Sequence, residues 1–241
     1  MTDPATRADP QRDSVTVDGK AARPARLRYI AFHKPVGIVS TMADPEGRPC
    51  VGDLLRAHRA RVFPVGRLDY ESSGLMLLTN DGELAERLSH PRFGVSRVYR
   101  VKVKGHPASA ALERLARGLR LADGPTAPAD VVVESLLEKK ARVQITLREG
   151  RQRQVRRMFE AIGHPVDRLS RVAIGPLRLG SLPVGEMREL EARELMALER
   201  AARTQPEPPE GRVTVRERAA RAGSRPRRNP ATTRTPGRKR P

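Results

Sequence analysis

Short segments rich in apolar residues recur between residues 27 and 203. Residues 27–33 and 75–78 are bounded by turns that contain Pro or Asn-Asp-Gly, a pattern that favours buried β-strands. Residues 131–137 and 143–147 are rich in valine, isoleucine and leucine, and they flank a polar Glu-Lys-Lys sequence. We predict that this second pair forms a β-hairpin.

The segment from Val95 to Lys104 alternates clearly. Tyr99, Val101 and Val103 fall on one face, and three basic residues fall on the other. This period of two is expected of a strand with one buried face and one solvated face. The outward residues are Arg100, Lys102 and Lys104.

Three segments have helical periodicity. Residues 83–88 follow an Asp-Gly turn, residues 109–117 precede a glycine, and residues 151–162 place apolar residues at i, i+3, i+4 and i+7 before another glycine. A glycine after the last apolar position commonly ends a helix. We find no long alternation of parallel strands and helices and no internal repeat, so we predict an α+β fold with a central, largely antiparallel sheet and flanking helices.

Composition divides the 241 residues into three parts. Residues 28–203 contain enough apolar residues for one sizeable domain. Residues 204–241 mix Pro with Arg and small polar residues, a composition that predicts a disordered basic tail. Residues 1–27 form an N-terminal extension, in which we expect 1–13 to be disordered and 14–20 to form a short strand and turn.

The chain carries a net charge of +19, and this excess is not confined to its ends. Residues 204–241 hold eleven Lys and Arg against three acidic residues, and residues 1–27 hold five against four, which leaves 31 against 21, or +10, for residues 28–203. Such an excess favours a polyanionic partner, and nucleic acid above a small neutral metabolite. Trp is absent and Phe and Tyr total seven, so we expect recognition through phosphate and shape rather than through stacking of many bases.

Several function classes are disfavoured. No run approaches the roughly 18 consecutive apolar residues of a membrane span, and the N-terminus contains acidic residues but no apolar stretch, unlike a secretory signal. We therefore expect a cytoplasmic protein that does not bind membranes. Cys50 is the single cysteine and the five histidines lack metal-ligand spacing, so we expect no disulfide, no metal and no organic cofactor.

The segment from Gly66 to Gly82 sets a charged pair in an apolar environment. Arg67 and Asp69 lie between a Val-Phe-Pro-Val sequence and the apolar run 75–78. A carboxylate at the edge of a core is tolerated only where a cation or several donors stabilise it, and Arg67 is two residues away. One interpretation is a structural ion pair that closes a turn, and the other is a functional carboxylate.

Four arginines crowd the start of the predicted helix 151–162. Exposed cations at a helix N-terminus oppose the macrodipole at a cost of roughly 0.3 to 1 kcal/mol each, which suggests that the site is used. Guanidinium groups bind phosphate through paired contacts, and one of them could reach Asp69 and keep it ionised. The residues are Arg151, Arg153, Arg156 and Arg157. The alternative is a solvated basic face, which we prefer for Arg157.

Tyr99 and the pair of His33 and Lys34 are further candidates for contact with nucleic acid. An inward tyrosine such as Tyr99 is usually part of a core, but beside an aspartate and arginines it could stack on an extruded base. His33 and Lys34 end a predicted strand before a Pro-Val-Gly turn. They offer two phosphate contacts, although a structural role is the better explanation of that pair.

In this order, these segments resemble the RsuA family of pseudouridine synthases, most closely its branch that modifies the RNA of the large ribosomal subunit. The resemblance runs from about His33 to Leu190 and implies the pseudouridine synthase fold with a mixed sheet, a basic cleft and no cofactor. It implies isomerisation of a specific uridine in ribosomal RNA, most closely 23S RNA, by an aspartate nucleophile that acts on a flipped-out base. The blocks that carry it are residues 33–37, 44–49, 66–82, 97–101 and 149–158.

The resemblance also implies roles for individual residues. Asp69 would be the nucleophile, Arg67 its companion in the same loop, Tyr99 the residue stacked on the target base, and Arg151 or Arg153 the basic partner of Asp69. The candidate RNA-binding residues are His33, Lys34, Arg97, Arg100, Lys102, Gln154 and Arg156.

The sequence departs from the family pattern before the catalytic domain. Relatives in this branch usually carry a complete small RNA-binding domain there, whereas here only residues 15–20 resemble its last strand and turn. We expect the binding contribution of that domain to be reduced and the basic tail to take over part of it. As partners we expect ribosomal RNA or a ribosomal subunit precursor, and we expect the protein to be a monomer.

Two rival functions stay open at this point. A noncatalytic RNA-binding or ribosome-assembly protein could use the same fold, although the set of Arg67, Asp69, Tyr99 and Arg151 argues against it. A glycoside or nucleoside hydrolase would need a second carboxylate for acid and base work. The nearest one, Glu71, is expected on an exposed turn.

Overall fold

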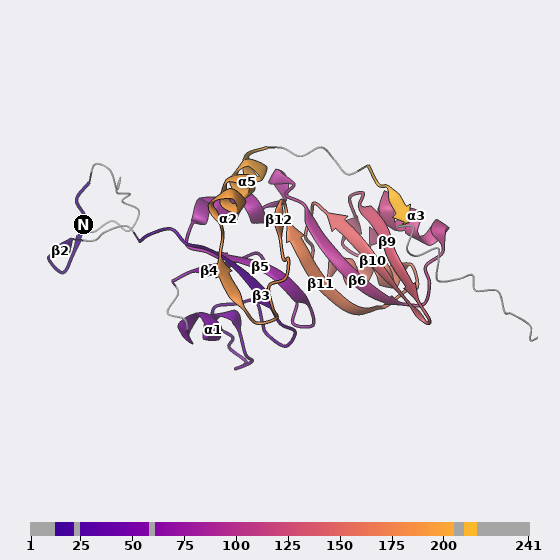
Figure 1. The fold of residues 1–241 in the computed structure, drawn as a ribbon, viewed down its shortest axis with the longest axis horizontal. Helices are drawn as coiled ribbons and strands as arrows, with labels where there is room; N and C mark the ends of the chain where they lie inside the picture. The colour runs from indigo at the N-terminus through magenta and orange to yellow at the C-terminus, as the bar shows by residue number, and fades with distance from the viewer. Residues whose placement is uncertain (1–12, 22–24, 58–60, 205–209, 216–241) are drawn as a thin grey trace, which may run out of the picture. The chain divides into compact units, whose positions relative to one another are not determined.

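The computed structural model of the chain describes residues 13–21, 25–57, 61–204 and 210–215. Their contacts define two compact units, and each is described here by itself (Figure 1). The long strands β6 (Arg97–Lys104) and β11 (Val166–Ile174) contribute residues to both units. The first unit comprises residues 1–98, 148–150 and 170–207, and the second comprises residues 99–147, 151–169 and 208–241.

The sheet of the first unit is built around β5, whose residues from Leu75 to Leu78 are completely buried. Strands β3 and β4 pair antiparallel with β5, β13 pairs antiparallel with β3, and β11 pairs parallel with β5. This mixed sheet confirms the predicted fold class. The bounds are β3 (Tyr29–Lys34), β4 (Phe63–Val65), β5 (Ser73–Thr79), β12 (Leu177–Arg178) and β13 (Met187–Glu189).

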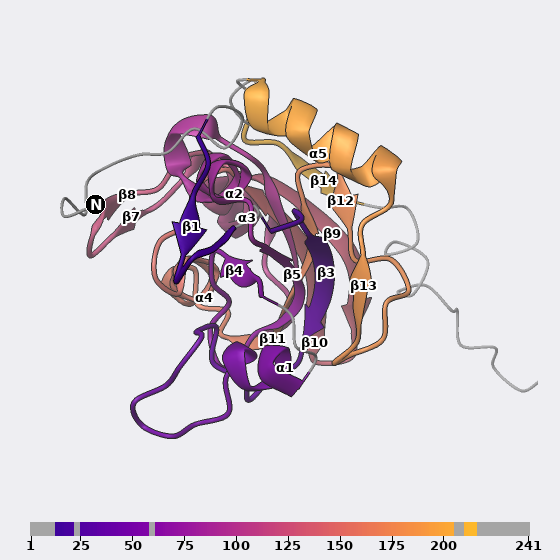
Figure 2. The ribbon, with the colours of Figure 1, turned by 90° about the vertical axis from the view of Figure 1, so that its left-hand side faces the viewer.

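Helices cover this sheet through a shared apolar core. The Asp81 carboxylate accepts a hydrogen bond from the Leu84 amide at 3.0 Å and begins α2, as the predicted turn requires. Helices α2 and α5 lie side by side (Figures 1 and 2), and Leu88 and Leu198 are buried in the same cluster as Leu75. The bounds are α1 (Val51–Ala57), α2 (Gly82–Ser89), a 3-10 turn (Pro91–Phe93) and α5 (Ala192–Arg203).

A close backbone approach fixes the pairing of β5 with β11. Arg171 is the register partner of Gly74, and a Cβ atom on Gly74 would lie 2.3 Å from the carbonyl oxygen of Arg171. Gly74 also has φ +117°, a conformation that side chains disfavour. Only glycine fits here, so the loop before β5 is held at a defined place relative to β11.

The second unit contains a sheet in the order β11, β6, β10, β9 and β14. Strands β9 and β10 form an antiparallel hairpin, which confirms the prediction for this segment. Val101 and Val103 of β6 are buried and Arg100 and Lys104 are exposed, as the alternation predicted. The bounds are α3 (Ser109–Arg117), β7 (Arg120–Leu121), β8 (Gly124–Pro125), β9 (Asp130–Leu137), β10 (Lys140–Leu147), α4 (Gln154–Ala161) and β14 (Val213–Val215).

Two predictions about this unit need correction. Helix α4 begins at Gln154 rather than at residue 151, because Arg153 at its N-cap has a left-handed backbone with φ 50°. The predicted disorder of residues 204–241 is wrong for residues 210–215, since Val213–Val215 pairs parallel with Val131–Val133 of β9. A two-valine alternation is too short to predict a strand unless a partner edge is known.

At the other end of the chain, Thr16–Val17 (β1) and Lys20–Ala21 (β2) form a small antiparallel hairpin, in agreement with the predicted strand and turn. The disorder expected for residues 1–13 concerns positions that, apart from Asp13, lie outside the described residues. Among the residues that the structure describes, no helix has the length and apolar character needed to cross a membrane.

The approach of β11 to β5 predicts the effect of a methyl group at position 74. Gly74→Ala should lower the free energy of unfolding by at least about 2 kcal/mol, because a strained backbone conformation and a clash with backbone atoms act together. The matched control is Gly82→Ala at the first residue of α2, where a Cβ would meet no atom within 4 Å. That variant should change stability by less than about 1 kcal/mol. Urea titration of both variants measures the difference, and equal stabilities would contradict the prediction.

Candidate active site

Asp69 lies in the loop between β4 and β5, and its side chain is half-buried. Gly66 begins the loop with φ 70°. The next apolar residue, Leu68, is buried; its amide donates to the Ser40 hydroxyl at 3.1 Å, and that hydroxyl donates to the Leu68 carbonyl at 2.6 Å. The Ser72 amide donates to the Asp69 carbonyl at 3.0 Å. The backbone on both sides of Asp69 is therefore fixed by hydrogen bonds.

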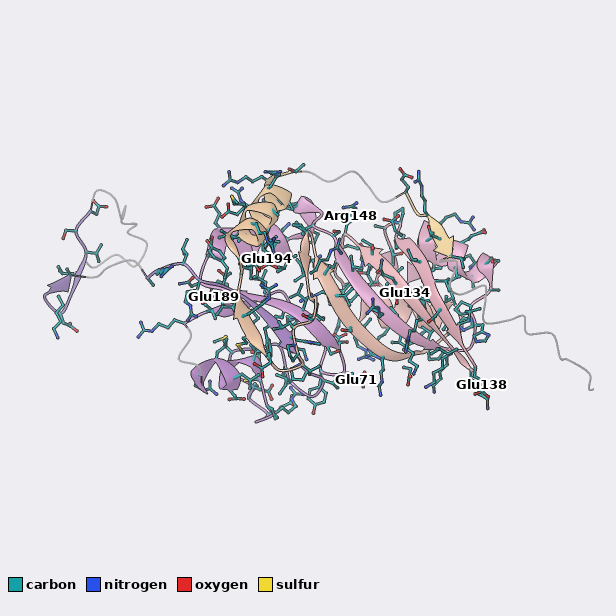
Figure 3. All side chains as sticks on the ribbon, in the orientation of Figure 1. Glu71, Glu134, Glu138, Arg148, Glu189 and Glu194 are labelled. Carbon is teal, nitrogen blue, oxygen red and sulfur yellow. The ribbon has the colours of Figure 1, made fainter. Side chains whose placement is uncertain are left out.

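Three other residues of the loop are exposed to solvent. Arg67 and Glu71 are exposed, and Tyr70 is 50% exposed (Figure 3 labels Glu71). The Tyr70 carbonyl accepts a hydrogen bond from the Gly37 amide at 2.9 Å, which ties the loop to the turn after β3. The exposed position predicted for Glu71 is confirmed.

Lys34 lies next to this loop, but not as a surface residue. Its side chain is completely buried, and its ammonium donates to the carbonyls of Pro35 at 2.8 Å and Ile38 at 2.7 Å. These two hydrogen bonds hold the turn that follows β3, which agrees with the structural role preferred for this pair. The contact of Lys34 with RNA stays a prediction.

Burial also changes the acidity of Lys34. Loss of hydration lowers its pKa from 10.5 to about 8; the negative charge of Asp69 opposes this shift and the positive charge of Arg171 adds to it. Lys34 therefore lies within electrostatic range of both a carboxylate and a guanidinium. The site is a cluster of one half-buried anion and two buried cations.

Arg171 is the functional candidate that the sequence analysis missed. Its side chain is 2% exposed, its Nε donates to the Leu75 carbonyl at 2.8 Å, and its Nη1 donates to the Arg67 carbonyl at 3.5 Å. A signal was present in the sequence, because Leu169, Arg171 and Ala173 occupy the buried positions of an alternating strand. An arginine on an inward face is costly, and that cost marks it as a residue to examine.

Two other candidates of the first unit make structural hydrogen bonds. A ring nitrogen of His33, Nδ1, lies 2.8 Å from the Leu182 carbonyl. Arg97 donates from Nη2 to the carbonyls of Leu88 and Ser89, both at 3.0 Å, at the C-terminal end of α2. A cation there stabilises the carbonyls that the helix leaves unpaired. Their contacts with RNA stay predictions.

In the second unit, Tyr99 is half-buried and packs against the apolar core. Its neighbour Arg100 is exposed and forms an ion pair with Glu134 at 2.8 Å (Figure 3 labels Glu134). Lys102 lies 3.9 Å from Asp167. The outward face of β6 is thus basic, as predicted, but each of these two cations already has an acidic neighbour.

Two arginines near the start of α4 bind the small β7–β8 hairpin. Arg151 donates from Nη1 to the Gly124 carbonyl at 3.2 Å and from Nη2 to the Pro125 carbonyl. Arg157 forms paired bonds to the Asp123 carboxylate at 2.9 and 2.8 Å, and this contact lowers the pKa of that carboxyl. The Arg157 side chain is partly exposed, and it forms this ion pair at the surface rather than in the core.

The remaining candidates of this helix differ in exposure. Arg153 is exposed at the N-cap. Gln154 and Arg156 are buried, at 3% and 6% exposure, and the Gln154 side-chain oxygen accepts the Arg151 amide at 3.0 Å. The contacts of Gln154 and Arg156 with RNA stay predictions.

A half-buried carboxylate beside buried cations, in a basic α+β protein, defines a candidate nucleophile for chemistry on a polyanion. Comparison with known proteins agrees with this class. Residues 28–161 match the family model of RNA pseudouridylate synthases, so the chain belongs to this family. The membership confirms the resemblance inferred from the separated sequence blocks.

Individual relatives and one solved structure resemble much of the chain. A ribosomal large subunit pseudouridine synthase B of Bacillus subtilis is 46% identical over 180 residues, which is 74% of this chain and 74% of that protein. An uncharacterized RNA pseudouridine synthase of Aquifex aeolicus is 42% identical over 196 residues, 81% of this chain and 79% of that one. A crystal structure of a pseudouridylate synthase has a TM-score of 0.66 at 29% identity and covers 80% of this chain and 83% of its own.

The lowered pKa of Lys34 predicts a pH dependence of stability. Between about pH 8 and 10.5 the unfolded chain keeps a proton on Lys34 that the folded protein has lost, so stability rises with pH in this window. Relative to Lys34→Met, the unfolding free energy of the wild type should be constant below about pH 7 and then rise by up to about 3 kcal/mol. Chemical denaturation of both proteins at several pH values measures this. A difference that is constant up to pH 10.5 would show that the pKa of Lys34 is not lowered.

Proposed function

We propose that the protein converts a specific uridine in ribosomal RNA, in the large subunit, to pseudouridine, with Asp69 as the nucleophile. The observation that carries this proposal is the position of Asp69: a half-buried carboxylate in a loop fixed on both sides, close to buried Lys34 and Arg171. Support for the substrate comes from relatives named as ribosomal large subunit pseudouridine synthases, in Bacillus subtilis and, at 40% identity, in Pseudomonas aeruginosa.

The reaction exchanges one bond for another. The Asp69 carboxylate attacks either carbon 1 of the ribose or carbon 6 of the base, and the bond between carbon 1 and N1 breaks. The base rotates, carbon 5 bonds to carbon 1, and the bond to the Asp69 oxygen breaks, which restores the carboxylate. Carbon 5 then loses its proton and N1 gains one. Substrate and product are isomers with no net redox change, so one anionic nucleophile and a defined binding pocket suffice.

The target base must leave its stack, which costs a few kcal/mol and least in an irregular RNA loop. Contacts of basic side chains with phosphates offset this cost. We assign the stacking contact with the target base to Tyr99. We assign the role of basic partner of Asp69 to Arg151 or Arg153, as the family resemblance implies.

The rival functions are less well supported. A protein that only binds RNA has no use for a half-buried carboxylate, which would repel RNA phosphates. A hydrolase would need a second carboxylate in a defined position, and the nearest along the chain, Glu71, lies exposed in the turn after Asp69 (Figure 3). The monomeric state and the cytoplasmic location belong to the same proposal.

Replacement of the nucleophile tests the reaction. Asp69→Asn should abolish formation of pseudouridine and keep RNA binding within about threefold, because the shape of the side chain is retained while its nucleophilic charge is lost. Pseudouridine mapping of ribosomal RNA from cells that carry the variant measures this and identifies the target uridine. The control is Glu71→Gln, which should retain modification. Full modification by Asp69→Asn would end the proposal for Asp69, and loss of activity in Glu71→Gln would favour a mechanism with two carboxylates.

The basic tail allows a second test. Truncation after Val215 keeps β14 and removes ten Lys and Arg residues and one Glu. The dissociation constant for ribosomal RNA should rise several-fold at low salt, with a smaller difference at high salt, because fewer counterions are released. The turnover of bound RNA should not change. Filter binding over a salt series measures the effect, and equal affinity at every salt concentration would show that the tail does not contribute.

A further inference from the structure

We propose that Arg171 is a positioning residue for Asp69, which holds the loop of the nucleophile from the neighbouring strand. The inference rests on the proposed role of Asp69 and extends it to a residue far away in the sequence. Its basis is that one guanidinium donates to carbonyls on both sides of Asp69. The Arg67 carbonyl lies two residues before the nucleophile, and the Leu75 carbonyl lies six residues after it.

The two hydrogen bonds differ in strength. The bond from Nε to the Leu75 carbonyl is 2.8 Å long and fixes the guanidinium against the beginning of strand β5. The bond from Nη1 to the Arg67 carbonyl, at 3.5 Å, is at the long limit of a hydrogen bond. One side of the loop is therefore held firmly and the other loosely. A small movement of the loop toward Arg171 would strengthen the second bond without breaking the first.

The backbone of β11 fixes where this guanidinium can go. Arg171 pairs with Gly74, and its carbonyl oxygen occupies the space that a side chain at position 74 would need. The side chain of Arg171 is 2% exposed and cannot move into solvent without exposing the core around it. Because both its backbone and its side chain are confined, Arg171 can transmit the rigidity of the sheet to the loop.

Electrostatics explain why an arginine is tolerated in this position. Among the described residues Nη2 of Arg171 is buried without a hydrogen-bond partner, and buried Lys34 adds a second positive charge nearby. Two buried cations are costly unless an anion lies close to them. Asp69 is the carboxylate within electrostatic range of Lys34.

A positioning role has a specific kinetic consequence. Displacement of a reacting group by about 1 Å can reduce the rate about a hundredfold, whereas RNA affinity depends mainly on phosphate contacts elsewhere on the protein. Loss of Arg171 should therefore reduce kcat and leave KM nearly unchanged. A purely structural residue would instead reduce the amount of folded enzyme and leave kcat per folded molecule as it was.

The experiment uses the full-length protein and a fragment of ribosomal RNA that contains the target uridine. We would compare Arg171→Lys and Arg171→Met with the wild type below their melting temperatures. Arg171→Met should lower kcat by at least about tenfold with KM within about twofold. Arg171→Lys, which retains the charge but can reach only one carbonyl at a time, should have an intermediate kcat.

A matched control separates positioning from stability. Arg188 on β13 also belongs to the first unit, and it forms an ion pair with Glu194 at 2.6 Å (Figure 3 labels Glu194). Arg188→Met should lower the melting temperature and leave kcat per folded molecule unchanged. The inference would be overturned by wild-type kcat in folded Arg171→Met, by a change confined to KM, or by equal losses of kcat in Arg171→Met and Arg188→Met.

Failure of this inference can be told apart from failure of the proposed function. If the wild type forms pseudouridine, Asp69→Asn does not, and Arg171→Met keeps the wild-type kcat, only the role of Arg171 is refuted. If the wild type forms no pseudouridine in ribosomal RNA, or if Asp69→Asn remains active, the proposed function itself is refuted. Wild-type activity and the Asp69→Asn variant therefore belong in the same set of assays.

Discussion

The backbone contact between Gly74 and Arg171 is the constraint on which the candidate site depends. Parallel strands β5 and β11 can approach this closely only because position 74 has no side chain. The approach fixes the end of the loop that carries Asp69, and it places the Arg171 side chain where it can bind that loop. The register of β5 and β11 and the position of Asp69 thus both depend on the absence of a Cβ atom at position 74.

Charge burial connects this packing to chemistry. Lys34 and Arg171 are both enclosed; Lys34 donates to two carbonyls of the turn after β3, and Arg171 donates to a carbonyl of β5. Their burial costs free energy that the apolar residues of β5 must offset. The carboxylate within electrostatic range of Lys34 is Asp69, the nucleophile that we propose. Stability and reactivity therefore make opposite demands on the same few residues, as is common at active sites.

The strongly basic composition does not translate directly into RNA contacts. Arg97, Arg151 and Arg157 donate to carbonyl groups or to a carboxylate within their own unit, and Arg100 forms an ion pair with Glu134. Such arginines stabilise helix ends and hairpins. A count of charges does not distinguish this structural role from RNA binding. A charge count likewise does not record burial, and Arg156, at 6% exposure, is an example.

The sequence alone determined the family, the α+β class, the β9–β10 hairpin and the place of Asp69, because periodic patterns and short ordered motifs are local properties of a chain. Only the tertiary structure decided that Lys34 is enclosed, that Arg171 lies beside the loop 104 residues before it along the chain, and that Val213–Val215 extends a sheet. Burial of a charge and pairing of a short strand depend on residues that are distant in sequence. A local sequence pattern does not indicate which distant residues these are.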